Sequence, residues 1–547
     1  MEWSRRTAEG LQAAARAFSN PALRRLEVAW FVSVTADLAT TVALGVYAFQ
    51  EGGAAGVGVA ALLRLLPSAV AAPILALPGD RFPRERVLMT MEGLRGCFVV
   101  AAGVGAALGW PALAVYGLMA AAAVASSALR SIQFALLPAL ATAPDELVAA
   151  NVGLATIEGL GGLLGPAIGG IFLAVFGPAV VLAGGGMIFV LAAILIGTIR
   201  VPVRFARGGP STRPLVEALE GVRTIATERD PRLVVGLFFA QTVVRGALAV
   251  FIVVTSIELL DLGEQGVGYL TAMIGVGGLV GAVVTLSLVG RPQLARWFGV
   301  GLVLWGLPLV LLAGSGVAIV AYVAMAIVGI GNNLTDVAGM TLLQRIVEDR
   351  LLARVLGALD GIVLAGAALG AAVAPPAIDA LGARGALATL GAALIVLVGL
   401  AQPGLRRLDR IASVPVEAVL LLRRVPMFAA LDIPTIDHLA RVAVPMSVAA
   451  GTVLIREGDH GDRVYVIDGG SFEVVRGGTQ LAILGEGDAV GEIALLKDVP
   501  RTATVTARED AQVLAVDRDH FLRAVTGFAL SLEEAHRTAE ARTGQHA

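Results

Sequence analysis

Long apolar segments alternate with short polar ones over roughly the first 400 residues of the chain. An α-helix of about 20 apolar residues crosses the hydrocarbon core of a bilayer. Twelve segments are long enough to do so, near residues 26–49, 57–78, 87–109, 112–137, 149–175, 178–199, 233–257, 266–289, 295–314, 316–343, 354–377 and 384–402. The polar stretch from Arg200 to Arg232 divides them six and six. The pattern predicts an all-α polytopic membrane domain with two pseudo-symmetric halves.

The hydrophobic pattern changes after Pro403. Residues 415–445 keep a helical period, and from Gly451 onward short alternating strands are separated by glycine-rich turns. Helical periodicity returns from about Arg518 to Arg537. Short strands between glycine turns, flanked by helices, predict a small α+β domain built on a β-roll.

Composition separates the two parts further. The 547 residues are 57% hydrophobic and 15% charged, with a mean hydropathy of +0.82, whereas a soluble protein has about 25% charged residues. All five histidines and the only lysine, Lys497, lie beyond residue 430. The net charge of −2 therefore averages over two chemically different regions. The single cysteine, Cys97, excludes an intramolecular disulfide.

Arginines set the expected topology, because positive charge near helix ends stays on the cytoplasmic side. One side of the membrane receives the arginines of the N-terminus, of the loop around Arg84, of residues 200–232 and of the segment around Arg406. The opposite loops carry mainly acids, such as Glu51 and Asp379. We expect a multi-pass protein of the cell membrane with both termini in the cytoplasm.

These patterns divide the chain into six parts. They are a cytoplasmic N-terminal lead-in (1–25), an N-terminal six-helix half (26–200), a cytoplasmic central loop (201–231), a C-terminal six-helix half (232–402), a helical coupling segment (403–423) and the β-roll domain (424–547).

The loop between the second and third apolar segments reads ALPGDRFPRERV. It resembles the Gly-x-x-x-Asp-Arg-x-x-Arg loop of the major facilitator superfamily, with Asp80, Arg81 and Arg84 matching and Ala76 in place of the leading glycine. The resemblance implies the major facilitator fold over residues 26–402. It also implies a cytoplasmic gate that is closed by charge-assisted contacts between helix ends.

The fifth apolar segment contains GGLLGPAIGG, which resembles the Gly-Pro motif of antiporters in the same superfamily. The matching residues are Gly161, Gly165, Pro166 and Gly169. Small residues let helices approach closely, and proline permits a kink. Ordinary small-residue packing is the alternative interpretation. The antiporter resemblance favours export over uptake.

Charged residues inside the apolar segments indicate a functional or structural role, because placing each charged side chain at the bilayer centre costs about 2.5–3.5 kcal/mol. In the superfamily, helices 1, 4, 7 and 10 line the central cavity, and here they carry Asp37, Arg130, Arg245 and Asp336. We predict that these four handle substrate or protons, with structural ion pairing as the alternative and, for Arg130 and Asp336, a gating pair as a further one. Glu158 is a further candidate carboxylate for proton coupling.

Other membrane charges have simpler expected roles. Glu92 and Arg95 are three residues apart on one helix face, so a local ion pair is expected. Arg64 and Asp360 are interpreted as gate or packing residues.

Residues 424–525 resemble the cyclic nucleotide-binding domain of catabolite activator proteins, cyclic nucleotide-dependent kinases and cyclic nucleotide-gated channels. The match includes a Gly-x-x-Gly-Asp turn from Gly458 to Asp462 and the segment VGEIALLKDVPRTATV from Val490 to Val505. The residues predicted to hold the nucleotide are Gly491, Glu492, Ile493, Ala494, Arg501, Thr502 and Ala503.

The chemistry of this segment fits a cyclic phosphate. Gly491 allows close backbone approach, and backbone N–H groups at a helix start hold anions. Arg501 is placed to neutralise the phosphate through a planar contact. Glu492 is suited to accept a hydrogen bond from a ribose 2′-hydroxyl. Val490 stands where many relatives have an aromatic residue, which is expected to alter packing beneath the segment.

The leading hypothesis is a secondary transporter for a small molecule of unknown class, regulated by cAMP or cGMP bound in the cytoplasm. The alternatives are a membrane-anchored cyclic nucleotide receptor without transport, or a transporter with a vestigial nucleotide domain. No nucleophile–base, metal or Walker pattern indicates an enzyme or a cofactor. No helix-turn-helix follows the β-roll, so nucleic acid is not an expected partner. The sequence leaves the oligomeric state open between monomer and dimer.

Overall fold

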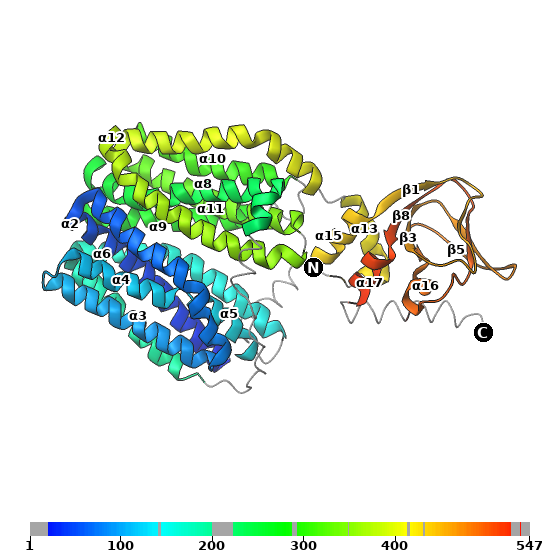
Figure 1. The fold of residues 1–547 in the computed structure, drawn as a ribbon, viewed down its shortest axis with the longest axis horizontal. Helices are drawn as coiled ribbons and strands as arrows, with labels where there is room; N and C mark the ends of the chain where they lie inside the picture. Colours follow the sequence, from blue (N-terminus) through cyan, green and yellow to red (C-terminus); the bar gives the residue numbers. More distant parts are fainter. Residues whose placement is uncertain are drawn as a thin grey trace, which may run out of the picture. The chain divides into compact units, whose positions relative to one another are not determined.

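The computed structural model describes residues 20–140, 144–199, 222–286, 293–347, 349–412, 416–429, 431, 433–526 and 537. The chain forms two compact units, Met1–Ala412 and Ser413–Ala547 (Figure 1). The first unit is helical throughout its described residues, and the second contains all the described strands.

The helices of the first unit lie side by side in one bundle (Figure 1). They are α2 (Pro21–Arg81), α3 (Arg84–Ala107), α4 (Ala112–Ser126), α5 (Leu129–Leu140), α6 (Pro144–Gly197), α8 (Arg229–Val254) with the π-turn η1 (Thr255–Leu259), α9 (Gly263–Leu286), α10 (Leu294–Ala313), α11 (Ala318–Ile346) and α12 (Asp349–Ala412).

Three of these helices are too long for one membrane crossing. α2, α6 and α12 contain 61, 54 and 64 residues, whereas about 20 suffice. Each is interrupted by glycine with positive φ, at Gly53 (56°), Gly177 (75°) and Gly382 (70°). L-residues rarely adopt this conformation, so glycine is where the chain leaves one helical pass and starts the next.

The number of passes follows from these breaks. Eight helical stretches of the described residues are long and apolar enough to cross a membrane. Three of them contain a glycine break and count twice, and α4 continued by α5 supplies a further pass, which gives twelve in the described part of the chain. The predicted multi-pass α-helical fold is confirmed. Arg81, Arg200 and the central loop from residue 201 to 221 lie partly or wholly outside the described side chains.

One face of α6 packs directly on the backbone of α2. Gly161, Gly165 and Gly169 lie on this face. A Cβ at Gly165 would be 2.6 Å from the carbonyl oxygen of Thr35, and one at Gly169 would be 2.8 Å from Cα of Ala39. Real Cβ atoms do not approach this closely, so the run that resembles an antiporter motif is also a close-packing surface.

A second face of the same helix packs on α9 in the C-terminal half. A Cβ at Gly268 would lie 2.5 Å from Cα of Gly170 and 2.5 Å from the carbonyl oxygen of Pro166. A Cβ at Gly275 would lie 2.5 Å from the carbonyl oxygen of Gly162. The two halves of the bundle therefore touch backbone to backbone here.

The second unit begins with three short helices and continues with eight strands. Its elements are α13 (Val416–Arg424), α14 (Pro426–Ala429), α15 (Ile433–Val442), β1 (Val444–Val448), β2 (Val453–Ile455), β3 (Arg463–Gly469), β4 (Phe472–Arg476), β5 (Thr479–Leu484), β6 (Ala489–Val490), α16 (Glu492–Lys497), β7 (Thr504–Ala507), β8 (Ala511–Asp517) and α17 (Arg518–Thr526).

The strands form two antiparallel sheets in the orders β1-β8-β3-β6 and β2-β7-β4-β5. Buried Ile467 and Phe472 contribute to the core that the sheets enclose, which confirms the predicted β-roll. On the helical side, the rings of Phe428 and Phe521 meet edge to face at 6.0 Å. α17 ends at Thr526 in the described residues, so the remainder of the final helix predicted up to Arg537 is not tested.

The α6–α9 contact makes a direct prediction. Gly268→Ala should lower the thermal unfolding midpoint of the purified protein, because the new methyl group forces α9 away from α6, and overpacking typically costs about 1–3 kcal/mol. Gly278→Ala, on the same helix, is the matched control, since a Cβ there meets nothing within 4 Å. It should be neutral or stabilising through helix propensity. Equal midpoints for the two variants would show that the backbone contact does not limit stability.

Candidate functional site

A pocket of about 140 Å³ opens in the β-roll beside α16. Its lining contains all seven residues predicted to hold a nucleotide, Gly491, Glu492, Ile493, Ala494, Arg501, Thr502 and Ala503. It also contains residues of β4 and β5, namely Val474, Arg476, Leu481, Ala482 and Leu484. The β-roll thus folds one short sequence segment against an apolar wall from earlier strands.

Gly491 turns the chain from β6 into α16. Its φ of 91° is in the left-handed region. A Cβ at this position would lie 2.4 Å from Nη1 of Arg501 and 3.1 Å from the carbonyl oxygen of Arg463. Both the turn and the close approach of the guanidinium therefore require glycine.

The guanidinium of Arg501 is fixed by backbone oxygens. It is 5% exposed. Nη1 donates to the carbonyl oxygen of Gly491 at 2.9 Å, and Nη2 donates to that of Arg463 at 2.7 Å. The nearest ion-pair carboxylate, Asp462 Oδ1, is 3.8 Å from Nη2 and belongs to a 79% exposed side chain.

Arg501 is therefore buried with only partial charge compensation. Burial lowers the pKa of its guanidinium, while the nearby Tyr465, Asp462 and Glu492 act in the opposite direction. An arginine side chain still stays charged at physiological pH. An anion in the pocket would supply the charge and the acceptors that solvent no longer provides.

The other predicted residues lie around the same pocket. Glu492 is 1% exposed at the start of α16, and Thr502 and Ala503 join Arg501 to β7. Val490 is buried in β6, opposite Tyr465 of β3. The prediction did not include Arg476, which ends β4 opposite Thr479 of β5 and lines the pocket. No local motif marks it.

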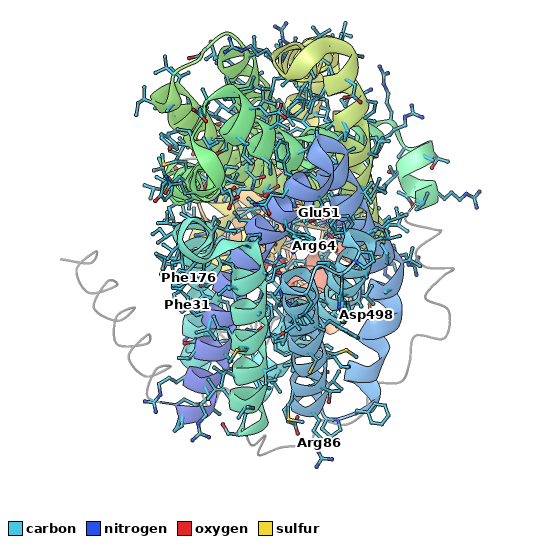
Figure 2. The ribbon with its side chains drawn as sticks, turned by 90° about the vertical axis from the view of Figure 1, so that its left-hand side faces the viewer. Phe31, Glu51, Arg64, Arg86, Phe176 and Asp498 are labelled. Atoms are coloured by element: carbon cyan, nitrogen blue, oxygen red, sulfur yellow. The ribbon has the colours of Figure 1, made fainter. Side chains whose placement is uncertain are left out.

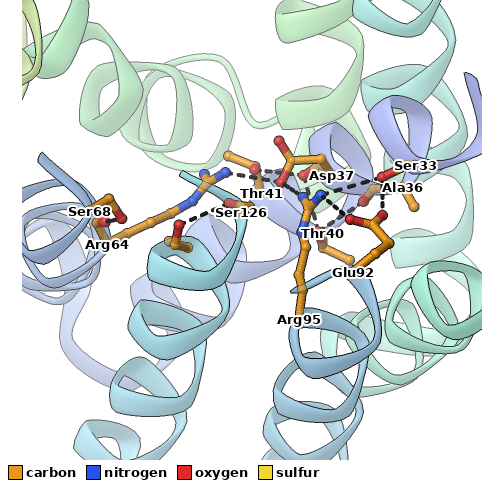
Figure 3. A network of polar contacts seen from close by, with 11 residues as sticks. Ser33, Ala36, Asp37, Thr40, Thr41, Arg64, Ser68, Glu92, Arg95 and Ser126 are labelled. Carbon is orange, nitrogen blue, oxygen red and sulfur yellow. Dashed lines mark hydrogen bonds and ion pairs between the residues drawn. The ribbon is translucent and has the colours of Figure 1, made fainter. Parts of the chain in front are cut away.

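In the membrane unit, Asp37 lies at the centre of a polar network (Figure 3). Arg95 of α3 donates to its carboxylate, and Arg64 from the second part of α2 contacts the same oxygen at 3.2 Å. Arg95 also lies 3.7 Å from Glu92, which confirms the expected local pair. Ser33 donates to Glu92.

Arg95 binds this network into the helix bundle. Its side chain is 8% exposed, and its guanidinium carbon stacks 3.8 Å from the ring centroid of Phe189 on α6. The network then contains two carboxylates, of Asp37 and Glu92, and two guanidinium groups, of Arg64 and Arg95, so its formal charge is zero. The structure pairs Asp37 with two arginines of its own half.

The remaining predicted charges lie in separate contacts. Arg130 and Glu158 form an ion pair at 3.0 Å, and Asp336 accepts a hydrogen bond from Asn332 at 3.1 Å. Arg84 begins α3, whereas the side chains of Asp80 and Arg81 lie outside the described residues.

A cavity of about 570 Å³ lies between the two halves of the bundle. Among the predicted cavity residues it contains Arg245, but not Asp37, Arg130, Asp336 or Glu158. It contains Arg64 instead, which the sequence analysis had interpreted as a gate or packing residue. In Figure 2, Arg64 lies near the boundary between the blue-to-cyan and green-to-yellow halves. In the sequence, the feature that could have indicated Arg64 as a cavity residue was its charge inside an apolar segment.

Comparison with known families agrees with both parts of the fold. The family model described as Major Facilitator Superfamily matches residues 28–294, and the one described as Cyclic nucleotide-binding domain matches residues 445–527. The chain joins a major facilitator domain to a cyclic nucleotide-binding domain. Both resemblances seen in the sequence are confirmed, and the major facilitator domain makes the chain a multi-pass membrane protein.

Individual relatives match one part each. A cAMP-dependent protein kinase regulatory subunit of Yarrowia lipolytica is 38% identical over 104 residues, which cover 19% of this chain and 28% of that protein's length. The structure of a point mutant of the nucleoside transporter NupG is 12% identical, with a TM-score of 0.58, over 71% of this chain and 99% of that chain. At that identity the likeness shows the fold alone.

A third similar structure is the regulatory domain of Toxoplasma gondii PKA, co-crystallised with cAMP. It is 31% identical, covers 20% of this chain and 43% of that chain, and has a TM-score of 0.19.

The network in the major facilitator domain makes a second prediction. Arg95→Gln should lower the thermal unfolding midpoint, because breaking a buried ion pair on one side costs about 3–5 kcal/mol. Glu92→Gln added to Arg95→Gln should restore part of the loss, since the buried acid whose described ion pair is with Arg95 is then removed, while Asp37 keeps Arg64. A double-mutant cycle measures this coupling.

Arg86→Gln is the matched control, because Arg86 is an exposed residue of the same helix. If Arg95→Gln and Arg86→Gln have the same thermal unfolding midpoint, the Asp37 network does not contribute to stability.

Proposed function

We propose that this protein is a membrane transporter regulated by a cyclic nucleotide, cAMP or cGMP, that binds its C-terminal domain in the cytoplasm. The observation that carries the nucleotide site is the buried, only partly compensated guanidinium of Arg501, which faces a pocket lined by the whole predicted segment. The major facilitator domain supports the transport function.

The pocket residues suggest a role for each part of the nucleotide. Arg501 would bind the cyclic phosphate, with backbone N–H groups beyond Gly491 as further donors. Glu492 would accept a hydrogen bond from the ribose 2′-hydroxyl. Leu481 and Leu484 offer apolar contacts to the base. The similarity to a relative named as cAMP-dependent supports cAMP over cGMP.

We further propose that both termini are cytoplasmic and that the membrane is the cell membrane. The arginine distribution supports this orientation, and cyclic nucleotide signals arise inside cells. The run from Gly161 to Gly170 supports export as the direction of transport.

The end of α12 offers a route by which nucleotide binding would reach the transporter. This helix continues past Pro403 to Ala412, so the predicted coupling segment starts inside it. Arg407 forms an ion pair with Asp230 at the start of α8. Asp409 accepts hydrogen bonds from the backbone N–H groups of Ala295 (2.7 Å) and Arg296 (3.1 Å) at the start of α10.

These contacts tie the last helix of the domain to two others at one end of the bundle. The C-terminal domain follows α12 directly, after residues 413–415. A displacement of α12 would therefore move the starts of α8 and α10. Regulation of this kind needs a nucleotide affinity that differs between transporter states, typically by about 1–3 kcal/mol.

Calorimetric titration of the full-length protein tests the nucleotide site. Wild type should bind cAMP or cGMP saturably, and Arg501→Ala should weaken binding on the order of 100-fold, because a hydrogen bond to a charged group contributes about 1.5–3 kcal/mol. In wild type, 2′-deoxy-cAMP should bind less tightly than cAMP. Glu492→Ala should remove that difference.

Arg508→Ala is the matched control, because Arg508 is exposed in the same domain and lies outside the pocket. Arg501→Lys, which keeps the charge, guards against loss of folding in the alanine variant. Absence of binding by folded wild type would leave a transporter with a structural C-terminal domain, and the regulatory proposal would be wrong.

Hydrogen–deuterium exchange tests the coupling route. Nucleotide should change exchange of the amides that start α10, near Ala295. In Asp409→Ala these amides should exchange faster and lose their dependence on nucleotide, while nucleotide affinity changes little. A nucleotide response identical to that of wild type would show that coupling does not pass through Asp409.

A further inference from the structure

The charged groups that line the central cavity are both cationic. The cavity of about 570 Å³ is lined by Arg64 from the N-terminal half and Arg245 from the C-terminal half, and its described lining contains no carboxylate. Its remaining walls are largely apolar, formed by side chains such as Leu38, Leu44 and Ile252.

Arg245 has unused hydrogen-bonding capacity. Its side chain is exposed to the cavity and makes no hydrogen bond or ion pair with any residue that the structure describes. The charge of Asp336 acts on it through space, but the described hydrogen bond of Asp336 comes from Asn332. A guanidinium offers five N–H donors, and those of Arg245 remain available to a ligand.

The other polar side chains of the lining are already engaged or buried, and Asn332 donates to Asp336 at 3.1 Å. Trp305 is 2% exposed and its indole Nε1 is buried, so this donor does not open on the cavity. The hydroxyls of Thr41 and Thr271 already donate to backbone oxygens of their own helices at 2.7 Å. Arg64 and Arg245 are therefore the lining groups whose N–H donors are open to a ligand, and an anionic head group matches them.

We propose that the transported substrate is a small organic anion, with a carboxylate, sulfonate or phosphate head and an apolar body. The inference rests on the proposed transport function and names its substrate class. The head group would lie between Arg64 and Arg245, where a single anion contacts both halves of the bundle. The apolar body would contact the aliphatic walls.

The Asp37 network makes Arg64 available for this contact. Arg64 contacts Asp37 at 3.2 Å, but Arg95 donates to the same carboxylate oxygen. When Arg64 turns towards a substrate, Asp37 keeps a buried guanidinium partner. The cost of leaving an acid unpaired in the membrane is thereby avoided.

A set of probes with one shape and different charges tests the proposal. Radiolabelled 4-phenylbutyrate, 4-phenylbutyramide and 4-phenylbutylamine have the same apolar body with an anionic, a neutral and a cationic head. Phenylbutyl sulfonate and phenylbutyl phosphate, added as competitors, rank the head groups. Binding is measured by scintillation proximity on the purified full-length protein, up to millimolar concentration.

The expected result is saturable binding of 4-phenylbutyrate, with the amide and the amine at least tenfold weaker. Arg245→Gln should weaken carboxylate binding at least tenfold, because it removes a charge-assisted contact. Arg245→Lys should fall in between. Arg384→Gln, which removes an arginine outside the cavity, should bind as wild type does.

Three results would overturn the proposal. They are the absence of saturable carboxylate binding, equal or tighter binding of the amine or amide, and carboxylate binding lost in Arg501→Ala but kept in Arg245→Gln. The last would place the anion in the C-terminal pocket. A cyclic nucleotide titration on each preparation separates the proposals, because nucleotide binding without carboxylate binding removes the substrate class and leaves the regulated transporter standing.

Discussion

A charge withdrawn from water must meet an opposite charge or a full set of hydrogen-bond partners, and most of this structure's polar geometry follows from that constraint. In the membrane unit, Arg95 meets it completely, with Asp37 and Glu92 as carboxylate partners and the ring of Phe189 beneath it. Elsewhere the constraint is met only in part. Arg501 is buried with less compensation than its charge requires, and Arg245 is exposed to a cavity without a hydrogen-bond or ion-pair partner among the described residues. Those two places are where we infer ligands.

Glycine packing determines where such charges come together. α6 lies against α2 through one glycine face and against α9 through another, at contacts that a single methyl group would fill. The two halves therefore meet with little side-chain material between them at α6 and α9. The cavity with Arg64 and Arg245 lies elsewhere along the same boundary. Close backbone contact in one place and an open cavity in another therefore follow each other along the boundary between the two halves.

The sequence predicted much of this and failed at identifiable points. Segment length and glycine are local properties, so the twelve passes and the β-roll followed from the chain directly. The partner of a charge is not local, because it depends on how each helix is rotated. For this reason the sequence placed Asp37 in the cavity, although its carboxylate is engaged by two arginines of its own half. It also missed Trp305 and Arg476, which carry no motif. The nucleotide segment was predictable as a set, because Gly491 and Arg501 lie within ten residues of each other and fold against one another.

The two incompletely compensated arginines differ in a way that suits two different tasks. Arg501 is held by two backbone carbonyls before any ligand arrives, so binding an anion costs little side-chain entropy, and preorganised contacts of this kind favour tight binding. Arg245 has no such anchor among the described residues, and ordering a long side chain costs up to about 2 kcal/mol. Because this entropy is lost each time a ligand binds, the affinity of the site is lower than that of a preorganised one. A low affinity at Arg245 suits a transporter, which must release its substrate. A high affinity at Arg501 suits a sensor, which must respond to a low nucleotide concentration.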